Sequence, residues 1–230
     1  MSGKIYLKNY FHWITLGVLA LFLQTPGAVA GAAETRPAGD EGGQPETHWP
    51  YEKLNVEQVR KLGHWGYYEK GCSYGAFYAL LAPLQESVGA PYTGIPAHML
   101  EFGRGGIVGE GDICGALLGS LAAINLVVDD DYDQLAEALL TYYRQTPLPT
   151  DISNVYARER EFLVAEYFTS ANLVSTVAGS VTCRHSRRKW MSITGHRRTS
   201  AERQERCARL TGDVAAKAAI LLNAWAMNKD

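Results

Sequence analysis

Cysteine is scarce in this chain of 230 residues, and its few copies are far apart. No Cys-x-x-Cys pair occurs, which disfavours a zinc ribbon or finger, and the spacing departs from the usual ferredoxin patterns. Cys-x-x-Cys-His is also absent, so covalent haem c is excluded on this chain. The four cysteines are Cys72, Cys114, Cys183 and Cys207. Only the fold can bring them together.

Alternating apolar and polar residues, the pattern of a half-buried strand, do not occur over a useful length. Apolar spacing instead predicts helices at 55–68, 72–81, 97–102, 113–128, 132–143, 151–165, 183–191, 200–210 and 213–226. No internal repeat is present. Hydrophobic residues make up 47% and charged residues 20% of the chain, as in ordinary globular proteins. We therefore predict a mainly α protein with a single compact multi-helix domain.

The N-terminus lacks an apolar run long enough to span a bilayer comfortably. Its shorter run, residues 13–23, follows Lys4 and Lys8 and precedes an Ala-x-Ala ending at Ala30, as in a secretory signal peptide. The expected divisions are a signal peptide at 1–30, a flexible leader at 31–50 and the folded domain at 51–230. We expect export, to the periplasm, and membrane attachment only if the signal stays uncleaved.

Charge is unevenly distributed along the chain, whose net charge is only −2. Between Arg184 and Arg209 there are nine Lys or Arg residues against Glu202 and Glu205. A basic face of this kind can steer an anionic protein partner, although a solvated face with counter-charges folded against it is an equal alternative. Nucleic acid is not an expected partner of an exported protein.

Small residues mark the segment after the second cysteine. Gly115 and Gly119 lie within an expected helix, where each glycine costs roughly 1 kcal/mol relative to alanine. They predict that a neighbouring helix or a cofactor approaches the backbone closely, and tight helix packing alone would account for them. The glycine-rich segment 103–111 does not fit the dinucleotide pattern and follows no strand.

Three uses of the cysteines stay open from spacing alone. Four cysteines in an exported protein most often form two disulfides, but four thiolates also hold zinc or an iron–sulfur centre, and free thiols can react. Other candidate ligands have simpler interpretations. His64 and His98 are more often packing residues, and the acidic run 129–131 favours the N-terminus of the following helix.

The order of the cysteines resembles a known family. The chain reads Cys72, then Cys114-Gly-Ala-Leu-Leu-Gly119, then Cys183 and Cys207, similar to the redox-active family named for the pattern Cys, Gly-Cys-Ala-x-x-Gly, Cys, Cys. The variant Cys-Gly-Ala-x-x-Gly, together with Lys189-Trp190 and the segment 205–211, resembles the cysteine-bearing domain of the split-Soret cytochromes c more specifically. The haem-attachment motif of those cytochromes is missing.

The resemblance implies an exported electron-transfer protein more than a catalyst with its own substrate. Its ligand set would be Cys72, Cys114, Cys183 and Cys207, holding an iron–sulfur cluster of the [2Fe–2S] type. A redox partner protein, for example a cytochrome, would dock on the basic face, and a homodimer is the family expectation. Arginines near the last two cysteines, including Arg206, would raise the reduction potential. The alternatives are a disulfide-stabilised periplasmic binding domain without metal, and a thiol oxidoreductase.

Overall fold

A computed structural model describes residues 49–229, so the expected signal peptide and nearly all of the expected leader lie outside the described residues. Packing is already established at the first of these residues. The Trp49 ring meets the ring of Tyr92 edge-on with 5.1 Å between centroids, and the Tyr92 hydroxyl donates a hydrogen bond to the Pro50 carbonyl at 2.8 Å. The packed domain therefore includes the last two residues of the segment expected to be leader.

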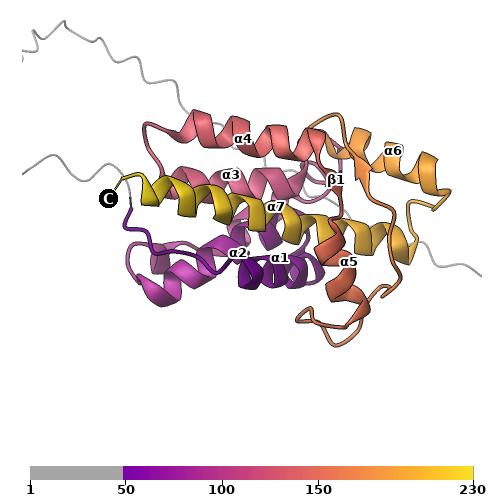
Figure 1. The fold of residues 1–230 in the computed structure, drawn as a ribbon, viewed down its shortest axis with the longest axis horizontal. Coiled ribbons are helices and arrows are strands. Elements are labelled where there is room, and N and C mark those ends of the chain that lie inside the picture. Colours follow the sequence, from indigo (N-terminus) through magenta and orange to yellow (C-terminus); the bar gives the residue numbers. More distant parts are fainter. Residues whose placement is uncertain (1–48, 230) are drawn as a thin grey trace, which may run out of the picture. The chain divides into compact units, whose positions relative to one another are not determined.

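The described residues are mainly helical, which confirms the predicted fold class (Figure 1). The α-helices are α1 (Val56–Lys70), α2 (Cys72–Ser87), α3 (Gly115–Val127), α4 (Tyr132–Gln145), α5 (Asp151–Arg158), α6 (Cys183–Thr194) and α7 (Ala201–Met227). The 3-10 helices are η1 (Tyr92–Gly94) and η2 (Ala97–Gly103). The strands β1 (Pro147–Leu148) and β2 (Thr176–Val177) pair antiparallel, with Pro147 opposite Val177.

Local sequence rules explain where several helices begin. The Asn55 side chain caps α1 by accepting hydrogen bonds from the backbone N–H groups of the second and third helical residues. Thr182 and Ser200 cap α6 and α7 in the same way. Gly71 separates α1 from α2 with a φ of 93°, a conformation that glycine adopts without the penalty of a Cβ. These positions agree with the predicted boundaries.

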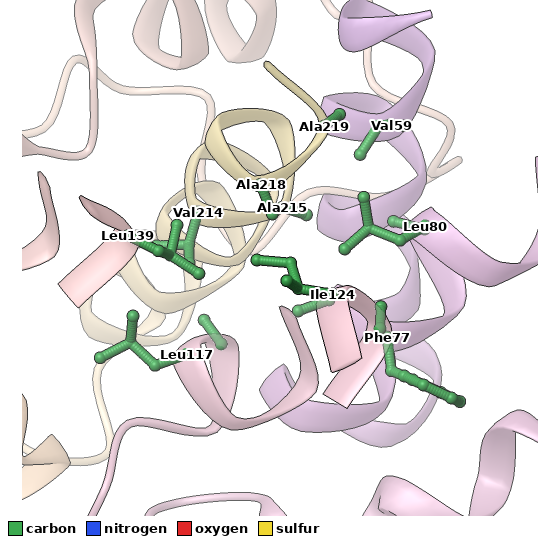
Figure 2. Packing of buried hydrophobic residues seen from close by; sticks show 14 of the residues in the cluster. Val59, Phe77, Leu80, Leu117, Ile124, Leu139, Val214, Ala215, Ala218 and Ala219 are labelled. Carbon is green, nitrogen blue, oxygen red and sulfur yellow. The ribbon is translucent and has the colours of Figure 1, made fainter. Parts of the chain in front are cut away.

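Helix α7 is the element around which the others pack. It contacts α1, α2, α3, α4 and α5, and Figure 1 shows it running between α3 and α4 on one side and α1 and α2 on the other. Figure 2 shows Ala215, Ala218 and Ala219 of α7 among larger apolar side chains that include Leu80 and Ile124. Small side chains on the central helix let its neighbours approach closely.

Glycines set the closest helix contacts. A Cβ on Gly63 would lie 2.9 Å from the Gly212 Cα, and one on Gly66 would lie 2.6 Å from the Gly75 Cα. These pairs bring α1 against α7 and against α2 at backbone distance. The cost of glycine inside a helix is therefore offset by burial of the neighbouring apolar surface.

Two expected helix boundaries were wrong. Helix α7 is continuous through Gly212, where two helices were expected, because that glycine packs against the backbone of α1. Helix α5 stops at Arg158, well before residue 165. Pro83 was expected to end or bend the second helix, and α2 continues through it as far as Ser87, with Leu84 buried beyond the proline. Among the residues described, no helix has the length and apolarity needed to cross a membrane.

Candidate metal centre

All four cysteines line one cavity of about 50 Å³. They come from four helices that lie far apart in the sequence, and all four are free thiols in the structure. Cys72 and Cys114 are buried, whereas Cys183 and Cys207 are partly exposed. The other residues around this cysteine cavity are Tyr67, Gly105, Tyr143, Arg187, Arg203, Arg206 and Leu210.

Three of the cysteines stand at helix N-termini. Cys72 is the first residue of α2, Cys114 is the N-cap of α3, and Cys183 is the first residue of α6. Cys207 lies within the second turn of α7. The N-terminus of a helix carries partial positive charge and unpaired N–H groups, so it favours a thiolate there by roughly 0.3–1 kcal/mol. The fold thus directs three helix dipoles at one cavity.

Backbone hydrogen bonds hold the second and third cysteines together. The Cys114 N–H donates to the Val181 carbonyl at 2.9 Å, and the Cys183 N–H donates to the Asp112 carbonyl at 2.6 Å. Ile113 forms a β-bridge with the residue that caps α6. This pairing joins segments about 70 residues apart, which is why the two helices start side by side.

The two glycines of α3 have separate tasks. A Cβ on Gly119 would overlap the Ser73 carbonyl oxygen, so this glycine allows α3 to approach α2. A Cβ on Gly115 would overlap the Cys72 sulfur and lie 2.7 Å from the Gly103 carbonyl oxygen. Gly115 therefore leaves the space that the first cysteine sulfur occupies.

Burial is the largest influence on the pKa of three of the thiols, those of Cys72, Cys114 and Cys183. It raises the pKa of Cys72 and Cys114 and brings the pKa of Cys183 to about 12, and the neighbouring thiols add to each effect. The Gly105 N–H opposes the shift of the Cys72 pKa, and Arg206 opposes the shifts of the other two. Clustered thiolates are therefore unfavourable here unless a cation lies among them.

Several polar atoms at the cavity have no partner. The Tyr143 hydroxyl is close enough to Cys114 to affect its pKa, but it completes no hydrogen bond. The Nε atoms of Arg187 and Arg206 are shielded from solvent and are also unpaired, although Arg206 donates through Nη2 to the Ser186 hydroxyl at 2.8 Å. Such atoms are costly to bury, so a concentration of them marks a place where another group binds.

The donor set fits a small centre of several atoms. Within residues 49–229, no three His, Cys, Asp or Glu side chains are placed to hold one metal ion. The four sulfurs instead surround a space large enough for roughly three waters. Thiolates are the usual ligands of iron–sulfur centres, and the surrounding guanidinium groups suit a centre of net negative charge. The residues present therefore fit a thiolate-bound iron centre.

Other sequence candidates lie elsewhere. His64 is buried and its Nε2 is 2.9 Å from a Glu205 carboxylate oxygen, while its ring stacks on Phe162 at 3.7 Å. It is the packing residue that was predicted. His98 is exposed on η2. Asp131 accepts a hydrogen bond from Trp225 and forms an ion pair with a lysine.

The nine basic residues between 184 and 209 do not form one surface. Arg209 is buried and donates to Glu205 and Asn154, at 2.9 and 2.7 Å, and Arg206 is buried at the cysteine cavity. Arg187 and Arg203 are partly buried at the same cavity. The exposed members are Arg184, Arg188, Arg197 and Arg198.

Sequence reasoning missed two groups at the cavity. Tyr143 reaches it from α4, and no local motif identifies that residue. Arg203 lies four residues before Cys207 on α7, and four residues is the spacing at which helical side chains lie on the same face. The same spacing separates Cys183 from Arg187. A residue four positions from a cysteine on the same helix could therefore have been predicted to lie at the cavity.

A mainly helical domain whose four cysteines converge on one cavity is the arrangement of a cysteine-centred redox-active protein. Residues 72–221 match the family model described as "Putative redox-active protein (C_GCAxxG_C_C)". The chain belongs to this family.

Comparison with known proteins gives a consistent result. The chain is 34% identical over 178 residues to the split-Soret cytochrome c of Desulfovibrio desulfuricans (strain ATCC 27774), which covers 76% of this chain and 61% of that protein. The chain thus spans less than two thirds of that relative. A solved structure of split-Soret cytochrome c from the same strain, described as having a novel iron centre, has a TM-score of 0.68 and 33% identity. That match covers 78% of this chain and 72% of the other.

Proposed function

We propose that the four cysteines hold an iron centre and that the protein is an electron carrier. The observation that carries this proposal is the convergence of four thiols from four helices on one cavity whose own polar atoms are left unpaired. The related protein described as having an iron centre supports iron as the metal. Four thiolates are the ligand set of [2Fe–2S] clusters, which we propose as the specific type.

The protein's residues prepare this cavity for a negatively charged centre. When bound, the iron centre supplies reversible one-electron chemistry. Arg206, at 3% exposure, places a permanent positive charge beside it. The α2, α3 and α6 N-termini add partial positive charge, and burial of Cys72 and Cys114 keeps water away. These groups favour the more negative, reduced state and therefore raise the reduction potential.

An acidic redox partner has a suitable docking surface on α6. Arg184, Arg188 and Lys189 line a hollow of about 530 Å³ together with Thr182, His185 and Ser192. Within residues 49–229 no acidic side chain lines this hollow, and the helix that carries it begins at Cys183, one of the two partly exposed cysteines. We propose that an acidic electron-transfer protein binds there, at a rate that falls as salt increases. Export to the periplasm and a homodimer complete the proposal.

Iron and acid-labile sulfide content of anaerobically purified protein tests the proposal. About two iron and two sulfide per chain would support the [2Fe–2S] type, and iron with another sulfide ratio would support an iron centre of another type. Cys114→Ser should lose the centre. Ser120→Ala on the same helix is the matched control, because Ser120 is buried but does not line the cavity.

Two results would redirect the proposal. Metal-free wild-type protein with no free thiols would favour the disulfide-stabilised binding domain, because the four sulfurs are mutual neighbours. Metal-free protein with one rapidly alkylated thiol would favour a thiol oxidoreductase. The raised thiol pKa values give that activity the least support, since the thiolate is the reactive form.

A further inference from the structure

A second, wider hollow lies directly against the cysteine cavity. This outer basin has a volume of about 490 Å³, within the usual size of ligand sites. It shares Tyr67, Cys72, Gly105, Arg187 and Arg203 with the cysteine cavity. The remaining residues around it are Tyr68, Glu69, Lys70, Gly71, Arg104, Val108, Gly109, Phe168, Arg198 and Gln204.

Four guanidinium groups from separate parts of the chain meet at the outer basin. Arg104 comes from the loop after η2, Arg187 from α6, Arg198 from the loop before α7, and Arg203 from α7 itself. In the part of the chain that the structure describes, no carboxylate forms an ion pair with any of them. The lysine of the basin is already paired with Glu101 at 2.5 Å. Glu69 is the one carboxylate among the described residues that line the basin, so the four guanidinium groups leave it with a net positive charge.

The arginines fall into two pairs with different surroundings. Arg187 and Arg203 line both the basin and the cysteine cavity, so the proposed iron centre can balance their charge. Arg104 and Arg198 line the basin alone. Both are exposed, so their guanidinium groups are accessible to an anion that enters from solvent, and the guanidinium fork matches the oxygens of a carboxylate or phosphate.

The other residues of the basin suit the apolar part of an organic molecule that carries such an anionic group. The Tyr68 and Phe168 rings stack with 4.3 Å between centroids. Val108 is 68% exposed in a loop that is fixed by its own hydrogen bonds, for example from the Gly109 N–H to the Arg104 carbonyl at 3.1 Å. The apolar residues and the arginines of the outer basin are therefore both in place before a ligand binds.

We infer that the outer basin binds a small organic oxyanion, carrying carboxylate or phosphate groups, beside the cysteine centre. Binding itself does not require iron. If the proposed function also holds, an anion in the basin lies close enough to share Arg187 and Arg203 with the centre and lowers its reduction potential, because added negative charge disfavours the reduced state.

Calorimetric titration of the full-length protein with pyrophosphate and with citrate tests the inference. Pyrophosphate or citrate should bind once per chain, and whichever binds more tightly identifies phosphate or carboxylate as the preferred group. Affinity should fall at least about tenfold in the double variant Arg104→Gln/Arg198→Gln. Arg197→Gln is the control, because this exposed arginine lines neither the basin nor the α6 hollow.

The outcomes separate this inference from the proposed function. Absence of binding by both probes, or an equal loss of affinity in Arg197→Gln, would overturn the inference that the basin binds an anion. Iron content and the visible spectrum should be unchanged in the double variant, since neither arginine lines the cysteine cavity. If metal-free protein still binds pyrophosphate, only the proposal of an iron centre is rejected. Iron-loaded protein that binds neither probe would reject the basin alone.

Discussion

Helix α7 borders two buried polar regions that differ in how completely they are hydrogen-bonded. In the first, Glu205 accepts from Tyr68 and Arg209 and pairs with His64, and Arg209 also donates to the Ala171 and Thr169 carbonyls at 2.9 and 2.8 Å. Further along the same helix, Asp213 accepts from Arg60, Ser153 and both the amide and hydroxyl of Thr150. Among the buried side-chain atoms of this network that the structure describes, only His64 Nδ1 lacks a hydrogen-bond partner.

The second region is the cysteine cavity, on a neighbouring face of the same turns of α7. Arg206 and Cys207 line it and lie between Glu205 and Arg209 in the sequence. There, among the residues that the structure describes, the Nε atoms of Arg187 and Arg206 have no hydrogen-bond partner, the Tyr143 hydroxyl approaches Cys114 without completing a hydrogen bond, and four thiols face one another. The comparison indicates that the two regions have different roles, one structural and one functional. A region whose charges are paired within the chain holds the fold together, whereas a region with charges and donors left over is prepared for a group that the chain itself does not supply.

The largest expected effect is loss of the paired network. Glu205→Ala leaves Arg209 buried without its carboxylate, which should lower the free energy of unfolding by about 3–5 kcal/mol. Glu159→Ala is the control, because its ion pair with Arg158 is exposed and contributes about 0–1 kcal/mol. Urea unfolding measures both. A loss below about 1 kcal/mol for Glu205→Ala would mean that this network does not hold the fold.

Alanine at the two α3 glycines should separate packing from metal binding. Gly119→Ala forces α3 away from Ser73 and should cost about 1–3 kcal/mol of stability while folded protein still binds iron. Gly115→Ala should cost a similar amount and also displace the Cys72 sulfur, so folded protein should contain less iron. Urea unfolding and iron per folded chain are the measurements. Equal iron loss in both variants would remove the special role of Gly115.

Removal of the buried arginine should change the potential of the centre more than its occupancy. Arg206→Ala removes the positive charge beside the thiols, so the reduction potential should fall. The exposed Arg188→Ala should leave the potential nearly unchanged, because solvent and salt screen its charge. Protein-film voltammetry compares the two. The same potential in Arg206→Ala and the wild type would contradict the role given to Arg206.

The smallest expected effect is a pH dependence from the paired network. Burial lowers the pKa of His64 below its ordinary value, so the unfolded chain binds a proton that the folded protein excludes. The resulting stability is present above about pH 6.5 and is lost as pH falls toward the folded-state pKa, by at most about 1.4 kcal/mol per pH unit. His64→Gln should flatten this slope between pH 7 and 5 in urea unfolding. An unchanged slope would assign the dependence to other groups.

Local rules of sequence predicted much of the fold. Asn55 and Gly71 mark helix boundaries through capping and positive φ, which depend on few neighbours. The continuity of α7 through Gly212 was missed because it depends on packing against α1, which lies about 150 residues earlier. Helix propensity is a property of the local sequence, so it cannot account for a contact with a distant helix.

The site was predictable in its ligands but not in its surroundings. The order of the cysteines and the motif around Cys114 led to the four thiols. The bridge between Ile113 and Thr182, which brings Cys114 beside Cys183, is a pairing that no local pattern specifies. The expectation of one basic face failed in part because a count of charges does not tell a buried Arg209 from an exposed Arg188.

X-ray absorption at the iron edge of anaerobically purified protein tests the central claim most directly. The account predicts a first coordination shell dominated by sulfur and a second iron scatterer, both lost in Cys114→Ser and retained in Ser120→Ala. An iron shell of nitrogen and oxygen that survives the cysteine substitution would contradict it, because iron would then be bound somewhere other than the cysteine cavity.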